Sequence, residues 1–259
     1  MNKAEEFKRE VESNIKRLHS DDEFTMISNE WLERSLPHKY SYNFSWLGRP
    51  IIQYPQDMVA VQELIWEVEP DLVIETGIAH GGSLILSASM LSLLDMKDAL
   101  SKGEMIDPSK TRRRVLGIDI EIRAHNRKAI ENHPFSYMIS MIEGSSTSES
   151  VVSQVHRYAR DYNRIMVMLD SNHTHEHVLK ELQSYASLIS VGSYCVVFDT
   201  VISNLDDSNF PDRPWNRESN PQTAVFEFLK NSDGFVIDER IHDKLQITVA
   251  PNGFLKRIR

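Results

Sequence analysis

The sequence predicts an α/β fold: a doubly wound, mostly parallel seven-stranded sheet with an antiparallel C-terminal edge and an N-terminal helical arm. Three observations carry this prediction. From Pro55 onward, short apolar strands alternate with helices. The strands are apolar on both faces, which is typical of a parallel sheet covered by helices. Two strand-like pieces close together near the C-terminus, one containing Pro-Asn-Gly, indicate antiparallel pairing at one edge.

Residues 1–50 differ in pattern from the rest, and we predict that they form a helical arm and a connecting loop. Phe7, Val11, Ile15 and Leu18 recur at helical spacing between charged residues. This face either packs on one edge of the main domain or contacts a neighbouring subunit, and we expect a homo-oligomer. Residues 51–259 then form the main domain.

The strands and helices of the main domain alternate in a regular order. The helix at 57–69 places Val59, Leu64 and Val68 in helical register. Further helices are expected at 81–96, 122–133, 148–162 and 174–189. The five parallel strands are expected at 71–76, 113–120, 136–146, 164–171 and 193–200, and the two tail strands at 234–241 and 245–259. The polar stretch 201–222 contains three prolines and is expected to be a lid or binding loop.

Composition excludes several classes of function. The net charge of −9 argues against general binding to nucleic acid. The single cysteine, Cys195, lies in an apolar run, so we expect a buried thiol and a cytoplasmic setting. The N-terminus lacks the apolar core of a secretory signal, and no stretch is apolar enough to span a membrane.

Acidic residues stand at the ends of four predicted strands: Glu75, Asp119, Asp170 and Asp199. Ligands of open parallel sheets bind outside the carboxyl ends of the strands. Carboxylates gathered at one edge repel each other unless hydrogen bonds, a metal or a cationic ligand offset the repulsion. The four acids therefore indicate a binding site at this edge.

The turn after the first parallel strand, ETGIAHGGS, contains Gly77, Gly81 and Gly82. Glycines allow a tight turn and expose backbone N–H groups at a helix start. The dinucleotide fingerprint G-x-G-x-x-G is absent, and so is the P-loop lysine. Glu75 indicates an amine-bearing ligand, and Asp119 is placed to accept hydrogen bonds from a ribose. A plain turn with no ligand remains the alternative.

The segments ETGIAHGGS, GIDI, EGSS, MLDSNHTHEHVLKEL and VGSYCVVFDT resemble the cephalosporin hydroxylase family over residues 50–259. That family contains S-adenosylmethionine-dependent O-methyltransferases related to macrolide-sugar O-methyltransferases. The resemblance implies a class I, Rossmann-like methyltransferase fold. It also implies methyl transfer from S-adenosylmethionine to a hydroxyl of a sugar or glycan.

The resemblance assigns residues to each part of the site. The catalytic residues would be His173, Asp170 and Asp199, with Asp170 and Asp199 as ligands of Mg²⁺ and His173 as general base. The cofactor-binding residues would be Glu75, Thr76, Gly77, Gly81, Gly82 and Ser83 at the methionine end, Asp119 and Ile120 at the ribose, Ser145 and Ser146 near the adenine, and Asp170.

One position departs from the family pattern. Metal-binding relatives carry two adjacent acids where this chain has Phe198-Asp199. Mg²⁺ tolerates several water ligands, so we expect a weaker metal site. Two other functions stay open: a nicotinamide-dependent oxidoreductase, and an S-adenosylmethionine-binding scaffold without catalysis.

The HTHEH segment lacks the metalloprotease spacing H-E-x-x-H. His173 and His177 would share a helix face from which His175 points away. His173 is either a general base or a residue of the helix cap, and we expect the other two to be polar first-turn residues. In the lid, Arg213, Trp215 and Arg217 either contact a sugar or hold the loop to the body. Trp46 and Tyr54 are candidates for the opposite wall of the pocket.

Overall fold

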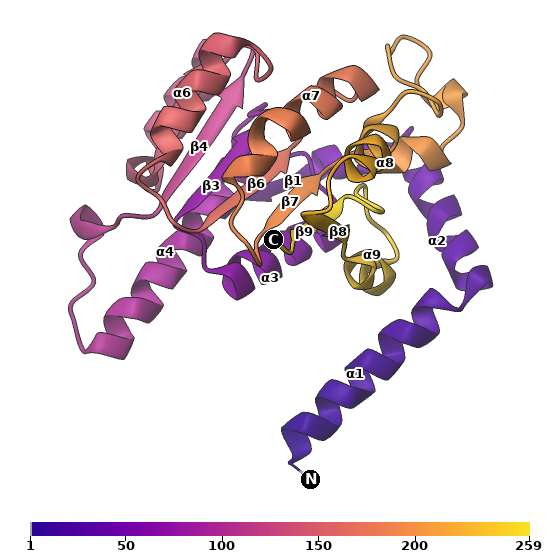
Figure 1. Cartoon of the computed structure of the whole chain (residues 1–259), viewed down its shortest axis with the longest axis horizontal. Coiled ribbons are helices and arrows are strands. Elements are labelled where there is room, and N and C mark those ends of the chain that lie inside the picture. Colours follow the sequence, from indigo (N-terminus) through magenta and orange to yellow (C-terminus); the bar gives the residue numbers. More distant parts are fainter. Residues whose placement is uncertain (1) are drawn as a thin grey trace.

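The computed structural model describes residues 2–259, which form a seven-stranded mixed sheet with helices on both faces (Figure 1). The strands lie in the order β5-β4-β3-β6-β7-β9-β8. This confirms the predicted doubly wound α/β class. The strands are β3 Leu72–Thr76, β4 Arg114–Asp119, β5 Ile139–Glu143, β6 Ile165–Leu169, β7 Tyr194–Val197, β8 Phe235–Ile237 and β9 Phe254–Arg257.

The strand order reverses beside β3. Strands β3, β4 and β5 run outward on one side, and the chain then returns to place β6 parallel to β3 on the other. β7 continues outward from β6, whereas β9 pairs antiparallel with β7, and β8 antiparallel with β9. The predicted antiparallel edge is thus confirmed. A reversal of this kind leaves a crevice at the carboxyl ends of the strands, where ligands of such sheets bind.

Helices cover each face of the sheet because both strand faces are apolar. β3 and β6 are buried along their whole length. One core layer holds side chains of α3 Pro55–Val68, α4 Gly82–Lys102, α5 Ala124–Glu131 and α9 Glu239–Leu245. The other holds side chains of α6 Glu149–Ala159, α7 His175–Tyr185 and α8 Pro221–Lys230. Cys195 is buried between them on β7, as expected.

The arm begins with two helices, α1 Lys3–His19 and α2 Asp22–Ser35. α1 extends away from the sheet and contacts α9 of the same chain (Figure 1). Of its predicted apolar face, Ile15 is 6% exposed but Phe7 is 64% exposed. His19 and Asp243 pair at 2.9 Å at this contact. The arm therefore packs on one edge of the main domain, and its contact with a second subunit stays a prediction.

Three elements differ from the sequence-based expectations. The loop before residue 51 contains a hairpin of β1 Phe44–Trp46 and β2 Arg49–Ile51, which crosses the predicted boundary at residue 50. The predicted tail strands were too long, because α9 forms between β8 and β9. Helix α8 was not predicted.

The buried face of α3 agrees in part with the predicted one, because Leu64 is buried and Val68 is partly buried against the core. Val59 is exposed, whereas Ala60, Val61, Leu64 and Ile65 are buried. Because α3 packs against both α4 and α9, its buried stripe is set by these two neighbours. Among the helices of residues 2–259, none has both the length and the apolar character required to cross a membrane.

Candidate functional site

A pocket of about 560 Å³ opens at the carboxyl edge of the sheet. It is walled by the turn after β3, the loop after β6, the end of β7 and two outer segments within 36–54 and 201–215. Six of the residues assigned to the cofactor, the metal or the base line it: Gly77, Gly82, Ser83, Asp170, His173 and Asp199. Residues about 120 positions apart in the chain therefore meet in one hollow. Of the four strand-end acids, Asp170 and Asp199 line it, whereas Glu75 and Asp119 are not among its lining residues.

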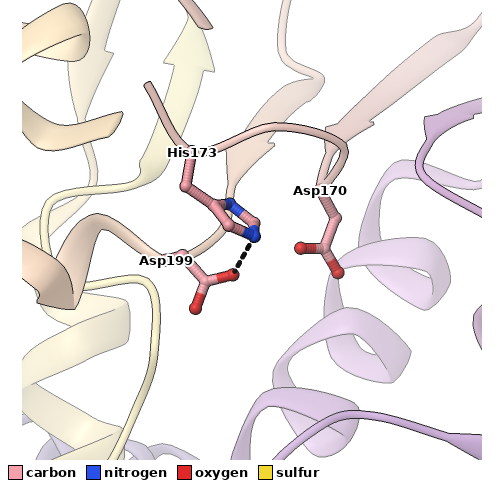
Figure 2. Close-up of side chains that lie close together, drawn as sticks. All are labelled: Asp170, His173 and Asp199. Carbon is pink, nitrogen blue, oxygen red and sulfur yellow. Dashed lines mark ion pairs between the residues drawn. The ribbon is translucent and has the colours of Figure 1, made fainter. Parts of the chain in front are cut away.

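The centre of the site is formed by Asp170, His173 and Asp199 (Figure 2). Leu169 and Val197 are register partners in β6 and β7, and Asp170 and Asp199 follow them by one and two residues, so both acids leave the same edge of the sheet. His173 stands just before α7, and its Nε2 lies 3.3 Å from Asp199 Oδ2. Asp199 itself has a φ of 55°, a left-handed backbone conformation that turns the chain sharply after β7.

These three side chains suit a divalent cation. One ligand atom from each lies within 4.8 Å of the others. Burial, followed by the Asp199 and Glu75 carboxylates, raises the pKa of Asp170 well above its usual value. A cation between Asp170 and Asp199 would relieve this repulsion. Two carboxylates with several waters match the ligands that Mg²⁺ prefers, so the residues fit such an ion.

Gln53 is a site residue that the sequence analysis missed. It follows β2 and lines the pocket, and its Nε2 donates to Asp170 Oδ2 over 3.1 Å. Its own Oε1 is buried without a hydrogen-bond partner among the described residues. A single glutamine between a hairpin and a helix carries no sequence pattern, so only the fold could reveal it.

A small pouch of about 20 Å³, room for one water-sized group, adjoins the main pocket beneath Gln53. Glu75, 2% exposed, lies in its wall. Ser83 Oγ donates to Glu75 Oε1, but Glu75 Oε2 has no hydrogen-bond partner within residues 2–259. Burial raises the pKa of Glu75 to about 8 and that of the neighbouring Asp57 to about 7. Phe198 forms part of the apolar wall where relatives would have an acid.

The glycines of the turn are required by protein neighbours as well as by any ligand. Gly77 has a φ of +90°, and a Cβ there would stand 2.0 Å from the Asp170 carbonyl oxygen. A Cβ on Gly82 would stand 2.3 Å from the carbonyl oxygen of Pro50. Gly81, with a φ of +82°, begins α4 without a side-chain cap in the described chain. The first turn of α4 therefore presents its positive dipole end to the pocket.

The Asp119 carboxylate accepts hydrogen bonds from the backbone of the same turn. Its Oδ2 accepts hydrogen bonds from the backbone N–H groups of Ile78 at 2.7 Å and Ala79 at 3.2 Å. Its Oδ1 accepts from the Glu121 N–H at 3.2 Å. The carboxylate thus shapes the turn in addition to any contact with a ribose.

The remaining predicted cofactor residues lie around the pocket rather than in its wall. Thr76 is fully buried at the end of β3, whereas Ile120 is 75% exposed beyond β4. Ser146 is buried, with its Oγ 3.1 Å from His177 Nε2. Ser145 Oγ lies 3.1 Å from Thr147 Oγ1. These contacts fix the loop after β5.

The lid supplies the outer wall. Trp215 meets the His173 ring edge-on at 4.8 Å, and Arg213 lies over the Trp215 ring at 5.2 Å. Arg217 instead donates from its backbone N–H to Asp207 within the lid. Tyr54 lines the pocket, while Trp46 donates to Ser89 Oγ on α4 and is not among the residues that line it.

The chain is similar to known proteins over most of its length. A family model described as rhamnosyl O-methyltransferase/CmcI matches residues 38–258. A rhamnosyl O-methyltransferase of Mycobacterium leprae (strain TN) is 29% identical over 230 residues, covering 85% of this chain and 88% of that protein. Its counterpart in Mycobacterium tuberculosis (strain ATCC 25618 / H37Rv) is 29% identical over 232 residues, covering 85% and 83%.

Solved structures support the fold. A CmcI structure described with Mg and SAM superposes with a TM-score of 0.55 at 16% identity, covering 84% of this chain and 78% of that one. A CmcI apo-structure gives a TM-score of 0.53 at 17% identity, covering 84% and 77%. At these identities the match establishes the shared class of fold.

Proposed function

The chain belongs to the rhamnosyl O-methyltransferase/CmcI family, and we infer from this membership that it is an S-adenosylmethionine-dependent O-methyltransferase acting on a hydroxyl of a sugar or glycan. The observation that carries the proposal is the meeting of His173, Asp199 and Asp170 beside the glycine turn in one pocket. A base, two carboxylates and a cofactor-type turn then face the same space.

The pocket fits the proposed cofactor in charge and shape. Within residues 2–259, Glu75 Oε2 is buried without a hydrogen-bond partner and suits an ammonium group, and the start of α4 has no side-chain cap and suits a carboxylate. These are the two groups of a methionine end. We assign the methionine end to Glu75, Thr76, Gly77, Gly81, Gly82, Ser83 and Asp170, the ribose to Asp119 and Ile120, and the adenine to Ser145 and Ser146.

The reaction requires a deprotonated acceptor oxygen in line with the methyl group. S-adenosylmethionine supplies an electrophilic methyl group on a sulfonium. The neutral His173 imidazole donates from Nε2 to Asp199 Oδ2, 3.3 Å away, so its other nitrogen, Nδ1, takes the proton of the acceptor hydroxyl and Asp199 stabilises the resulting imidazolium. Trp215 restrains the imidazole ring from the other side. The remaining contribution of the protein is to orient the two reactants.

Asp170 and Asp199 would hold a Mg²⁺ ion, whose charge would lower the pKa of the acceptor hydroxyl. Because Phe198 replaces one acid, we expect weak binding that chelators remove easily. Chelation should lower turnover and added Mg²⁺ should restore it. Asp199→Ala should abolish the response to Mg²⁺ while leaving cofactor binding nearly intact by calorimetry.

A sugar acceptor is supported by the names of the relatives and by the pocket wall. Both mycobacterial relatives are rhamnosyl O-methyltransferases. Trp215 and Arg213 offer an aromatic face and a cation at the pocket mouth, which suit stacking and hydrogen bonding to a sugar ring. We further propose a homo-oligomer with a cytoplasmic location, which light scattering and fractionation would test.

Two measurements decide the proposed function. Calorimetry should show micromolar binding of S-adenosylmethionine or its demethylated product, about −8 kcal/mol. Mass spectrometry on a panel of sugar and glycan acceptors should show a gain of one methyl group. Binding of NADH in place of both cofactor forms would support an oxidoreductase. Cofactor binding with every acceptor unchanged would support a scaffold.

A further inference from the structure

The two histidines that follow His173 in the HTHEH segment contact different parts of the molecule. His175 Nδ1 lies 2.8 Å from Thr223 Oγ1 and its Nε2 3.1 Å from Glu227 Oε2, both on α8. His177 instead contacts the loops that follow β5 and β6. The mechanism above uses neither residue.

His177 joins three side chains through one nitrogen. Its Nε2 lies 3.1 Å from Ser146 Oγ, 3.2 Å from Ser171 Oγ and 3.4 Å from Glu181 Oε1. Ser171 Oγ donates its own proton to Glu181 Oε1 over 2.7 Å. Ser171 can therefore only accept from His177, so Nε2 carries the proton in this arrangement.

The same helix face makes a second contact with the loop after β5. Tyr185 donates its hydroxyl proton to the carbonyl oxygen of Ser146. His177, Glu181 and Tyr185 are spaced four residues apart, which places them along one face of α7. Glu181 and Tyr185 are buried, and the Glu181 side chain is 0% exposed. The side chains on this face of α7 therefore form a hydrogen-bonded polar network that is largely buried.

The sheet does not connect these two loops directly. β5 and β6 are separated by β4 and β3 in the strand order. The loop after β5 carries Ser145 and Ser146, and the loop after β6 carries Asp170, Ser171 and His173. The α7 face is therefore a direct hydrogen-bonded link between the two loops.

We propose that His177, supported by Glu181 and Tyr185, is a positioning residue that locks the loop after β5 to the loop after β6. Cofactor affinity and the placement of His173 then depend together on an imidazole to which no contact with the cofactor or the acceptor is assigned. The ligand part of this inference rests on the proposed function, whereas the locking of the loops does not.

Hydrogen exchange with mass spectrometry on the full chain, free of ligand, tests the lock itself. His177→Ala should speed exchange in peptides covering both 144–148 and 170–174. His175→Ala is the matched control, and should speed exchange near Thr223 and Glu227 while leaving the two loops as in the unmodified protein. Faster exchange confined to α7 in His177→Ala would overturn the proposal.

Calorimetry with S-adenosylhomocysteine as the probe tests the consequence. His177→Ala should weaken its binding by roughly 3- to 10-fold, and His177→Gln, which keeps an N–H donor, should recover most of the loss. Unchanged affinity in His177→Ala despite a lower melting temperature would reduce the residue to a structural role. If the unmodified protein binds no S-adenosylhomocysteine, the proposed function is wrong. The hydrogen-exchange result still shows whether His177 links the two loops.

Discussion

The carboxylates at two neighbouring strand ends differ in hydrogen bonding and in burial. Asp119, the last residue of β4, accepts three backbone hydrogen bonds and is partly exposed. Glu75, at the end of β3, accepts one hydroxyl bond, leaves Oε2 unpaired among residues 2–259 and is almost fully buried. Asp119 and the turn that it holds, called the paired side below, are therefore preformed. We call Glu75, Gln53 and Asp170 together the unpaired side. Burial and mutual repulsion of its carboxylates are unfavourable, and a cationic ligand would offset this cost.

This contrast distinguishes the groups that shape the site from the groups that interact with a ligand. A satisfied carboxylate holds the turn whether or not a cofactor is bound. An unsatisfied one raises the free energy of the ligand-free protein, so binding of a positive group gains by relieving it. We expect changes on the paired side to alter affinity through the shape of the turn, and changes on the unpaired side to alter ligand affinity, turnover or pH dependence.

The largest expected effect is at the chemical end of the unpaired side. His173→Ala should lower turnover roughly 10²–10⁴-fold, because it removes the general base. Affinity for S-adenosylhomocysteine should stay within about 3-fold, since no cofactor contact is assigned to His173. The measurement is initial rate and calorimetry on the same preparation. A large loss of affinity with normal turnover would show that His173 serves cofactor binding and not the chemical step.

Asp119→Ala should produce the next largest effect, on the paired side. Losing hydrogen bonds to a charged group should weaken cofactor binding by about 1.5–3 kcal/mol. The melting temperature should also fall, because the N–H groups of Ile78 and Ala79 lose their acceptor. Turnover at saturating cofactor should change little. Normal affinity would mean that Asp119 serves the turn alone.

Glu75 should make the stability of the ligand-free protein depend on pH. Its pKa is about 8 in the fold against a usual 4.5, so the folded state holds a proton that the unfolded chain has released. The contribution of Glu75 to stability should therefore be fully present below about pH 4.5 and be lost as the pH rises toward 8, with a slope approaching 1.4 kcal/mol per pH unit. Asp57 adds a similar slope up to about pH 7.

Chemical denaturation of Glu75→Gln across this range should show a shallower decline than the unmodified protein. Asp57→Asn is the comparison variant, and its residual decline should extend to higher pH. Identical curves for Glu75→Gln and the unmodified protein would show that the Glu75 carboxyl is ionised in the fold.

Gln53→Leu should give the smallest effect. It removes the donor to Asp170 Oδ2, so Asp170 is held less firmly. A neutral hydrogen bond contributes about 0.5–1.5 kcal/mol, which corresponds to a roughly 2- to 10-fold loss of turnover. Gln56→Leu is the control, because Gln56 also buries an unpaired Oε1 but does not line the pocket. Equal losses in both variants would remove Gln53 from the site.

The parallel core and the acidic strand ends could be predicted from sequence because apolar runs followed by acids are local signals. Helix α8 also had such a signal: Asn220 caps it, Pro221 opens it and Thr223 completes a capping box. The prediction missed it because the preceding prolines suggested a continuous loop. Gln53 and His177 could not be predicted, since their roles depend on contacts 117 and 31 residues away along the chain.

The insertion of β9 between β7 and β8 has a consequence for biosynthesis. The Gly253 carbonyl accepts from Val197 N–H at 2.8 Å, just before the turn that carries Asp199. Along the chain β9 comes after both strands it joins, so newly made β8 must wait for its only partner in the described sheet. At about 5–20 residues per second, β7 also spends a few seconds with that edge unpaired. A nascent chain therefore acquires its Asp199 turn late, after the cofactor-type turn at Gly77 has been made.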